Sequence, residues 1–190
     1  MKLSLLAASL LLSSSLYASQ THGTSAKSEG LQAIKLLGST LKSQLKEKLQ
    51  QDSNGTVAIT FCTSEAQAIT QKVNTELPSH IKVRRTSLQL RNAANQADNL
   101  DIKIMKNYKK SFEKKTAGAA LITVVEREAF TRVYKPLTVG AVCLKCHGTN
   151  VSPVIAEKIQ AAYPKDAAIG MKEGDFRGVI VAEIKKIHSL

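Results

Sequence analysis

Aromatic side chains are scarce in this chain of 190 residues: Phe, Trp and Tyr make up 4% of it, and Trp is absent. Sugar-binding surfaces and single-stranded nucleic-acid platforms are commonly built by stacking on such side chains. The composition therefore argues against both classes, and we expect no nucleic-acid partner. Hydrophobic residues nonetheless reach 43%, which excludes a mostly disordered chain.

Acidic residues are few relative to basic ones. The chain has 27 Lys and Arg against 15 Asp and Glu, which gives a formal net charge of +12. Such a charge can steer an acidic redox partner or an anionic surface toward the protein. The lysines are nevertheless spread over what the pattern predicts to be outer helix faces, and this favours ordinary solvated side chains.

Long apolar runs are missing except at the beginning of the chain. Met1-Lys2 is a positively charged start, Leu3 to Leu16 is rich in Leu, Ala and Ser, and Tyr17-Ala18 ends on a small residue. This pattern is typical of a secretory signal peptide, here residues 1–18. The run is short and serine-rich for a membrane span, and an uncleaved anchor is the alternative. We expect export to the periplasm, with no membrane span after cleavage.

Cysteine is also rare, with three in the chain. Two belong to Cys143-Leu144-Lys145-Cys146-His147, the C-x-x-C-H pattern of covalent c-type haem attachment. The thiols reach two vinyl groups of one porphyrin, and the next residue offers its imidazole to the iron. A disulfide or thioredoxin-like pair has no use for the adjoining His, and half a zinc site needs a second ligand pair. We predict one covalent haem c per chain, attached through Cys143 and Cys146, with His147 as an iron ligand.

Cys62 is the remaining cysteine. Apolar spacing predicts one helix from Thr56 to Leu77, ended by Pro78, and places Cys62 on its inward stripe. An inward cysteine is most often a buried structural residue. The small Ala58 and Ala66, one helical turn to either side, also leave room for a flat group such as a porphyrin. Both interpretations stay open on the pattern alone.

The remaining patterns predict an α+β protein in which helices pack against a small antiparallel sheet. Ser25 to Gln50 has the apolar spacing of an amphipathic helix, suited to packing or to a homodimer. Another helix is expected after the cap residue Asp98, and a third after Ser152-Pro153. Strands are expected at Ile81–Leu88, in a hairpin formed by Ala119–Glu126 and Ala129–Leu137, and at Gly178–Ile184.

An ordered set of motifs is spread over most of the mature chain. The motifs are Ala58-Ile59-Thr60-Phe61-Cys62, Arg84-Arg85-Thr86-Ser87-Leu88, Arg91-Asn92-Ala93-Ala94-Asn95, Tyr134-Lys135-Pro136-Leu137, the C-x-x-C-H segment with Gly148, Tyr163-Pro164-Lys165-Asp166-Ala167-Ala168-Ile169-Gly170 and Gly174-Asp175-Phe176-Arg177-Gly178. This set resembles the exported, single-haem c-type cytochromes with a PAS-like fold, long catalogued as a domain of unknown function. Two departures from the pattern of that family are Ala93 after Asn92, where Pro is usual, and Ala168, where Thr is frequent.

The resemblance implies a PAS-like antiparallel sheet with N-terminal helices, helical insertions and the haem on one face. The N-terminal helix would occupy residues 19–55, and the haem c domain residues 56–190. It also implies that the thiolate of Cys62 binds the iron opposite His147. Other candidates for that position are Met105, Met171, His80 and His188. A thiolate opposite imidazole should keep the reduction potential low, and its release on reduction would open a site for a small gas.

Several polar residues are candidates for holding the haem. Arg84 and Arg85 alternate along a predicted strand, so one of them should face inward. Arg85, Arg91 or Arg177 could pair with the haem propionates, with surface charge as the alternative for each. Tyr163 and Tyr134 could each supply a hydroxyl donor, and core packing is the alternative for both.

Two functions follow from these predictions. The first is a redox or gas sensor, and the second is a small electron-transfer protein; both require a redox or signalling protein as partner. A peroxidase-like haem enzyme would need an open distal site with acid and base groups, and no distal His or Arg constellation is recognisable. We therefore predict no catalytic residues and no enzyme activity.

Overall fold

The computed structural model describes residues 25–52, 54–116 and 121–186. The predicted signal peptide and His188 lie outside these residues. Within the described part of the chain, no helix combines the length and the apolar character needed to cross a membrane.

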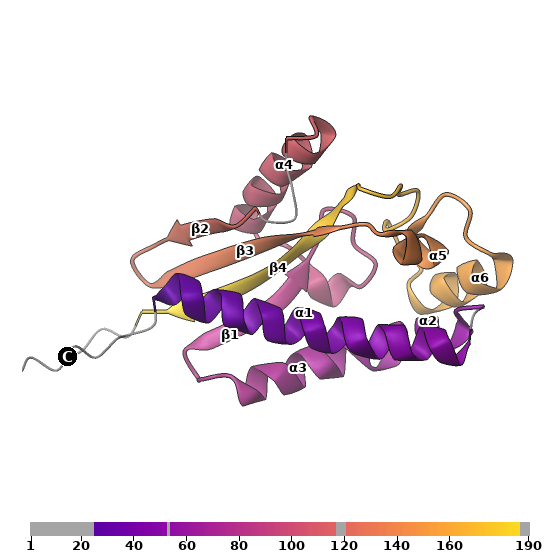
Figure 1. Cartoon of the computed structure of the whole chain (residues 1–190), viewed down its shortest axis with the longest axis horizontal. Helices are drawn as coiled ribbons and strands as arrows, with labels where there is room; N and C mark the ends of the chain where they lie inside the picture. The colour runs from indigo at the N-terminus through magenta and orange to yellow at the C-terminus, as the bar shows by residue number, and fades with distance from the viewer. Residues whose placement is uncertain (1–24, 53, 117–120, 187–190) are drawn as a thin grey trace, which may run out of the picture.

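A four-stranded antiparallel sheet forms the centre of the fold (Figure 1). Its strands are β1 (Ile81–Thr86), β2 (Thr123–Glu126), β3 (Phe130–Thr138) and β4 (Phe176–Lys185), in the spatial order β1-β4-β3-β2. The last strand along the chain therefore lies between two earlier ones, with Ala182 opposite both Val83 and Val133. The predicted α+β class and the predicted hairpin, β2 and β3, are confirmed.

Helices cover both faces of this sheet. Alternate residues of β4 point to opposite faces, as the two-residue period of a strand requires. Ile180, Ala182 and Ile184 pack with helices α1 (Ala26–Gln51) and α3 (Ala66–Glu76). Val179 and Val181 pack on the other face, with Met105 and Tyr108 of α4 (Asn99–Glu113). Figure 1 shows α1 and α3 on one side of the sheet and α4 on the other.

Local capping accounts for where the long helices begin. The side chain of Ser25 accepts a hydrogen bond from the backbone N–H of Ser28 at the start of α1. Asp98 and Asp101 form a reciprocal capping box at the start of α4. Caps of this kind pair backbone N–H groups that have no partner inside the helix, and they therefore fix the residue at which the helix begins. Both starts agree with the sequence prediction to within one residue.

The prediction of one helix from Thr56 to Leu77 is wrong. The segment forms α2 (Thr56–Ser64) and α3, which meet at Glu65. Hydroxyl groups near the break bond to the backbone, since both Thr63 and Ser64 donate to the carbonyl of Thr60, at 2.9 and 2.7 Å. Such bonds offer the backbone an alternative to a regular helix. As a result α3 follows the sheet, whereas α2 turns toward one end of it.

That end of the sheet is covered by short elements. Helix α6 (Pro153–Ala162) begins after Ser152, as predicted, and packs Ile155 and Ile159 against Ile59 of α2. The 3-10 helix η2 (Ala141–Cys143) leads directly into α5 (Leu144–His147), and a second short 3-10 helix, η1 (Ala93–Asn95), follows β1. Figure 1 shows α2, α5 and α6 gathered at this end.

A buried carboxylate ties α4 to the sheet. Asp101 is fully buried; it pairs with Arg84 of β1 and with Arg132 of β3, and it accepts a hydrogen bond from the Tyr134 hydroxyl at 2.9 Å. A buried charge is stable only when it is paired and hydrogen-bonded, and here both conditions are met. Tyr134 is therefore a core residue of the α4 face, the alternative given above for it.

Two glycines of α1 are expected to respond in opposite ways to alanine. A Cβ at Gly30 would lie 2.5 Å from Val133 Cγ2, a stiff and fully buried side chain, so Gly30→Ala should lower the free energy of unfolding by about 1–2 kcal/mol. A Cβ at Gly38 would meet only the terminal methyl of Ile180, at 3.2 Å, so Gly38→Ala should raise it by up to ~1 kcal/mol through helix propensity. Urea denaturation of both variants checks this, and shifts of the same sign would contradict the packing of α1.

Candidate functional site

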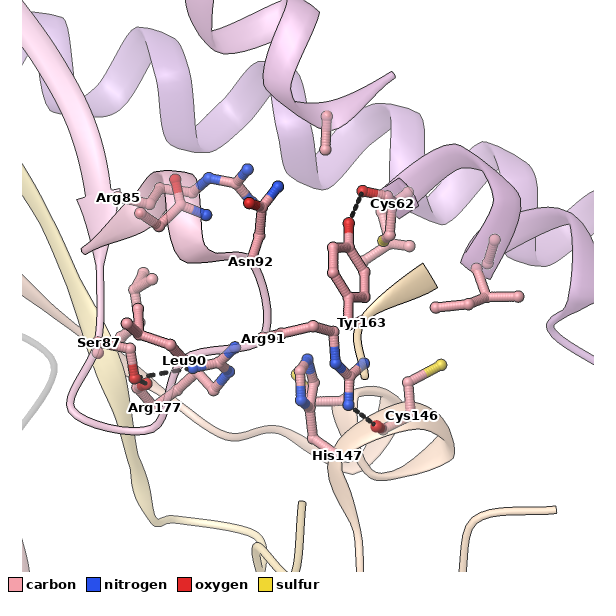
Figure 2. Close-up of a pocket in the computed structure, with 18 of the residues that line it drawn as sticks. Cys62, Arg85, Ser87, Leu90, Arg91, Asn92, Cys146, His147, Tyr163 and Arg177 are labelled. Carbon is pink, nitrogen blue, oxygen red and sulfur yellow. Dashed lines mark hydrogen bonds between the residues drawn. The ribbon is translucent and has the colours of Figure 1, made fainter. Parts of the chain in front are cut away.

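A cavity of about 250 Å³ lies at the end of the sheet that α2 and α5 cover. Its lining comes from α1, α2, the start of α3, β1 and the segment after it, the end of β3, the segment from η2 to α5, the residue after α6, and the start of β4. Eight candidate residues of the sequence analysis line it: Cys62, Arg85, Arg91, Cys143, Cys146, His147, Tyr163 and Arg177. Figure 2 shows Cys62 and His147 entering from different elements, with the arginines around them.

The cysteine pair is carried on consecutive helical turns. Cys143 ends η2 and Cys146 lies in α5, so the spacing of three residues places both on one side of the turn. Gly148 ends α5 with its N–H bonded to the carbonyl of Leu144. A Cβ there would lie 2.6 Å from that same carbonyl oxygen. The glycine is thus required by the turn itself.

His147 is held as a neutral imidazole. Its Nδ1 lies 2.7 Å from the backbone oxygen of Ala168. A carbonyl oxygen only accepts, so Nδ1 carries the hydrogen and Nε2 keeps its lone pair. Burial, together with the positive charges of Arg177 and Arg91, lowers the pKa of His147 to about 3. Neutral imidazole with a free Nε2 is the form that binds a metal ion.

The backbone of Cys62 is hydrogen-bonded to the residue that follows α6. Its carbonyl accepts a hydrogen bond from the hydroxyl of Tyr163 at 3.3 Å (Figure 2). Burial raises the pKa of the Cys62 thiol, as does the nearby Cys146, whereas Arg85 and Arg91 act in the other direction. The side chain lines the cavity beside Ala58 and Ala66, the two small residues expected to leave space.

Arg91 is paired with a carboxylate. Its Nε and Nη2 donate to the two carboxylate oxygens of Asp166, at 3.2 and 3.0 Å. The side chains are only 9% and 5% exposed, so surface charge, the alternative for this arginine, is wrong. Nη2 also donates to the carbonyls of Cys146, at 2.6 Å, and Ala168, at 3.0 Å.

Arg177 and Arg85 have no such carboxylate. Arg177 donates to Ser87 Oγ at 2.9 Å and to the carbonyl of Gln89 at 3.3 Å, and its pKa falls to about 10 because of burial and the neighbouring Arg91 and Arg85. The Nε of Arg85 is buried without a hydrogen-bond partner. Neither forms an ion pair with any of the described residues. The cavity therefore carries two uncompensated cations, which favours an occupant with two negative charges.

The other candidates for an iron ligand lie elsewhere. Met105 of α4 is packed against Val179 and Val181 of the sheet, and Met171 belongs to a small cluster with Val139 and Ala168. His80 pairs with Glu29 at 3.2 Å. None of these three lines the cavity, whereas Cys62 does.

Some residues of the site were not found from the sequence. Asp166 and Ala168 lie in a motif that carried the resemblance, but nothing in the sequence pairs them with Arg91 or His147. Ser87 holds Arg177 from the segment directly after β1. Leu45 and Leu49 of α1 also line the cavity. Their spacing predicts an amphipathic helix, but such spacing does not identify the part of the molecule that the apolar face contacts.

Comparisons with known proteins give two matches. The profile of the Tll0287-like family, described as Tll0287, matches residues 15–184. Among solved structures, the chain is similar to the cyanobacterial heme-protein Tll0287, with a TM-score of 0.63 and 20% sequence identity over 84% of this chain and 94% of that chain. None of the curated proteins matches. At this identity the structural match establishes a shared fold.

Loss of the Tyr163 hydroxyl should loosen α2 specifically. Tyr163→Phe removes the hydrogen bond to the Cys62 carbonyl and should lower the free energy of unfolding by ~1 kcal/mol, with faster amide hydrogen exchange in α2. Tyr108→Phe is the matched control, because that hydroxyl donates to the backbone carbonyl of Tyr134 at 3.2 Å, far along the chain from α2. Equal exchange of α2 in the two variants would contradict the tethering role of Tyr163.

Proposed function

Because the chain belongs to the Tll0287-like family, we propose that it is a haem-binding redox protein with one haem c attached through Cys143 and Cys146. His147 and Cys62 would supply the ligands that hold its iron. The observation that carries this proposal is the convergence of both residues, the cysteine pair and two unpaired arginines on a single cavity. The heme named for the cyanobacterial structure supports the same group.

The charges of the cavity fit a haem. The group carries two propionates, and Arg85 and Arg177 supply two guanidinium ions that lack a carboxylate among the described residues. Guanidinium pairs well with carboxylate because two parallel hydrogen bonds form. Of the three arginines predicted for this role, we assign these two, since Arg91 already binds Asp166.

The residues of the chain have distinct tasks. A bound haem would supply a one-electron redox centre, and a thiolate ligand from Cys62 would keep its reduction potential low. His147 offers Nε2, while its Nδ1–H donates to Ala168 and so fixes the ring orientation. Cys62 would bind as the thiolate: burial raises the pKa of its thiol, Arg85 and Arg91 act against that rise, and binding to the metal would remove the proton. Tyr163 holds the helix that carries Cys62.

Sensing is the function that the architecture favours. Cys62 lies on α2, a short helix separated from α3 at Glu65, so release of the thiolate on reduction would free a discrete element rather than the whole sheet. Electron transfer is the second candidate, favoured by Val142, a residue of the attachment segment that lines the cavity and is 53% exposed. Both roles place the protein in the periplasm with a redox or signalling protein as partner. A homodimer through α1 stays a prediction.

Covalent attachment is the first test. Protein produced in a host that matures cytochromes c should keep its haem through denaturing electrophoresis, one per chain, because thioether bonds survive unfolding. Cys143→Ala combined with Cys146→Ala should abolish this retention. Cys62→Ala should preserve it, which makes it the matched cysteine control. Wild-type protein that loses all haem on denaturation would contradict c-type attachment.

The sixth ligand is the second test. Cys62→Ala should change the low-spin ferric EPR signal and raise the reduction potential, because a thiolate no longer donates charge to the iron. Met105→Leu is the control, since this sulfur is fully buried on the α4 face and does not line the cavity. An unchanged signal in Cys62→Ala would exclude thiolate ligation.

Measurements on the wild-type protein distinguish the sensor, the electron carrier and the enzyme. Carbon monoxide binding to the ferrous form, with faster exchange in α2, supports the sensor. Fast electron exchange without gas binding supports the carrier, and turnover of peroxide would instead support the enzyme alternative.

A further inference from the structure

The guanidinium of Arg91 joins three segments that are distant in the sequence. Arg91 follows β1, Cys146 belongs to the haem-attachment turn, and Asp166 and Ala168 follow α6. A single nitrogen, Nη2, donates to the carboxylate of Asp166 and to the carbonyls of Cys146 and Ala168. Figure 2 shows Arg91 extended toward the turn that carries Cys146 and His147.

The carbonyl of Ala168 is shared between this arginine and the histidine. It accepts from His147 Nδ1 at 2.7 Å and from Arg91 Nη2 at 3.0 Å. A carbonyl oxygen has two lone pairs, so both bonds form at once. Asp166 completes the arrangement, because its Oδ1 accepts from the backbone N–H of Ala168 at 2.9 Å while both its oxygens bind Arg91.

We propose that the Arg91–Asp166 pair is the positioning device of the proposed iron ligand His147: it fixes the Ala168 carbonyl that orients the imidazole and sets the charge behind that ring. This inference rests on the proposed function and assigns Arg91 a task other than propionate binding. Arg91 and Asp166 act through His147 and are positioning residues.

Burial makes the pair sensitive to the loss of either member. Both side chains are more than nine-tenths buried, and removal of one partner leaves an uncompensated charge beside the attachment turn. Two further backbone hydrogen bonds join the segment after α6 to the attachment turn. Gly170 N donates to the carbonyl of Gly148 at 3.1 Å, and Met171 N donates to the carbonyl of His147 at 2.9 Å. The segment 166–171 is therefore a continuous support for the histidine.

Opposite electrostatic effects follow for the two partners. A positive charge near the iron favours the reduced form. It also weakens the hydrogen bond between the Ala168 carbonyl and the imidazole, so the ring donates less electron density to the iron. A negative charge does the reverse. The pair is nearly neutral as a whole, so neutralising one member uncovers the charge of the other.

The test compares four variants of the haem-loaded protein. Arg91→Gln should lower the reduction potential, Asp166→Asn should raise it, and the double variant should return it close to the wild-type value. Both single variants should also speed amide hydrogen exchange in residues 166–171 by about tenfold or more, because the buried pair is broken. Arg91→Lys keeps the charge without the two-pronged geometry, so it should speed exchange while leaving the potential nearly unchanged.

Asp101→Asn is the matched control. Asp101 is a buried, arginine-paired carboxylate on the α4 face and does not line the cavity. Its loss should lower stability without a shift in potential and without faster exchange in residues 166–171. Shifts of the same sign in Arg91→Gln and Asp166→Asn, or unchanged exchange in both, would overturn the positioning role. A wild-type protein that binds no haem would instead contradict the proposed function.

Discussion

The burial of arginine charge is the constraint on which this site depends. Three guanidinium ions border one small cavity, and the described residues place a single carboxylate, Asp166, beside one of them. A buried charge without a partner is strongly unfavourable. Arg177 is accommodated by the hydroxyl of Ser87 and a backbone carbonyl, whereas Arg85 keeps a buried Nε without a partner. An occupant with two negative charges, such as the proposed haem, would balance these two cations and so stabilise this end of the fold.

A second cluster of buried charges in the molecule is separate from the arginines of the cavity. The second buried ionic cluster, around Asp101, lies on the α4 face, and none of its members lines the cavity. The two clusters are carried by the same strands, since Arg84 and Arg85 are neighbours in β1 and point to opposite sides. One strand thus supplies a structural cation to one face and a site cation to the other.

Local features of the sequence predicted much of this structure. Caps, turns and apolar periodicity act over a few residues, so α1, α4, α6 and the hairpin are found near their predicted bounds. The C-x-x-C-H segment is equally local, and Cys62, predicted to face inward, lines the same cavity as this segment. Features that depend on distant partners were not predictable: the break at Glu65 separates two helices with different tertiary neighbours, and the Arg91–Asp166 pair joins residues 75 positions apart. Single-sequence patterns contain no information about such pairings.

The position of β4 has a consequence for the order in which this protein assembles. Strand β4 comes last along the chain yet lies between β1 and β3, and it contributes Arg177 and Gly178 to the cavity. A chain that is synthesised from its N-terminus, or threaded through a channel in that direction, presents the attachment turn before this strand exists to complete the sheet. Both cysteine thiols are then accessible before the sheet is complete, and arrival of the final strand adds the wall of the cavity that Arg177 and Gly178 form.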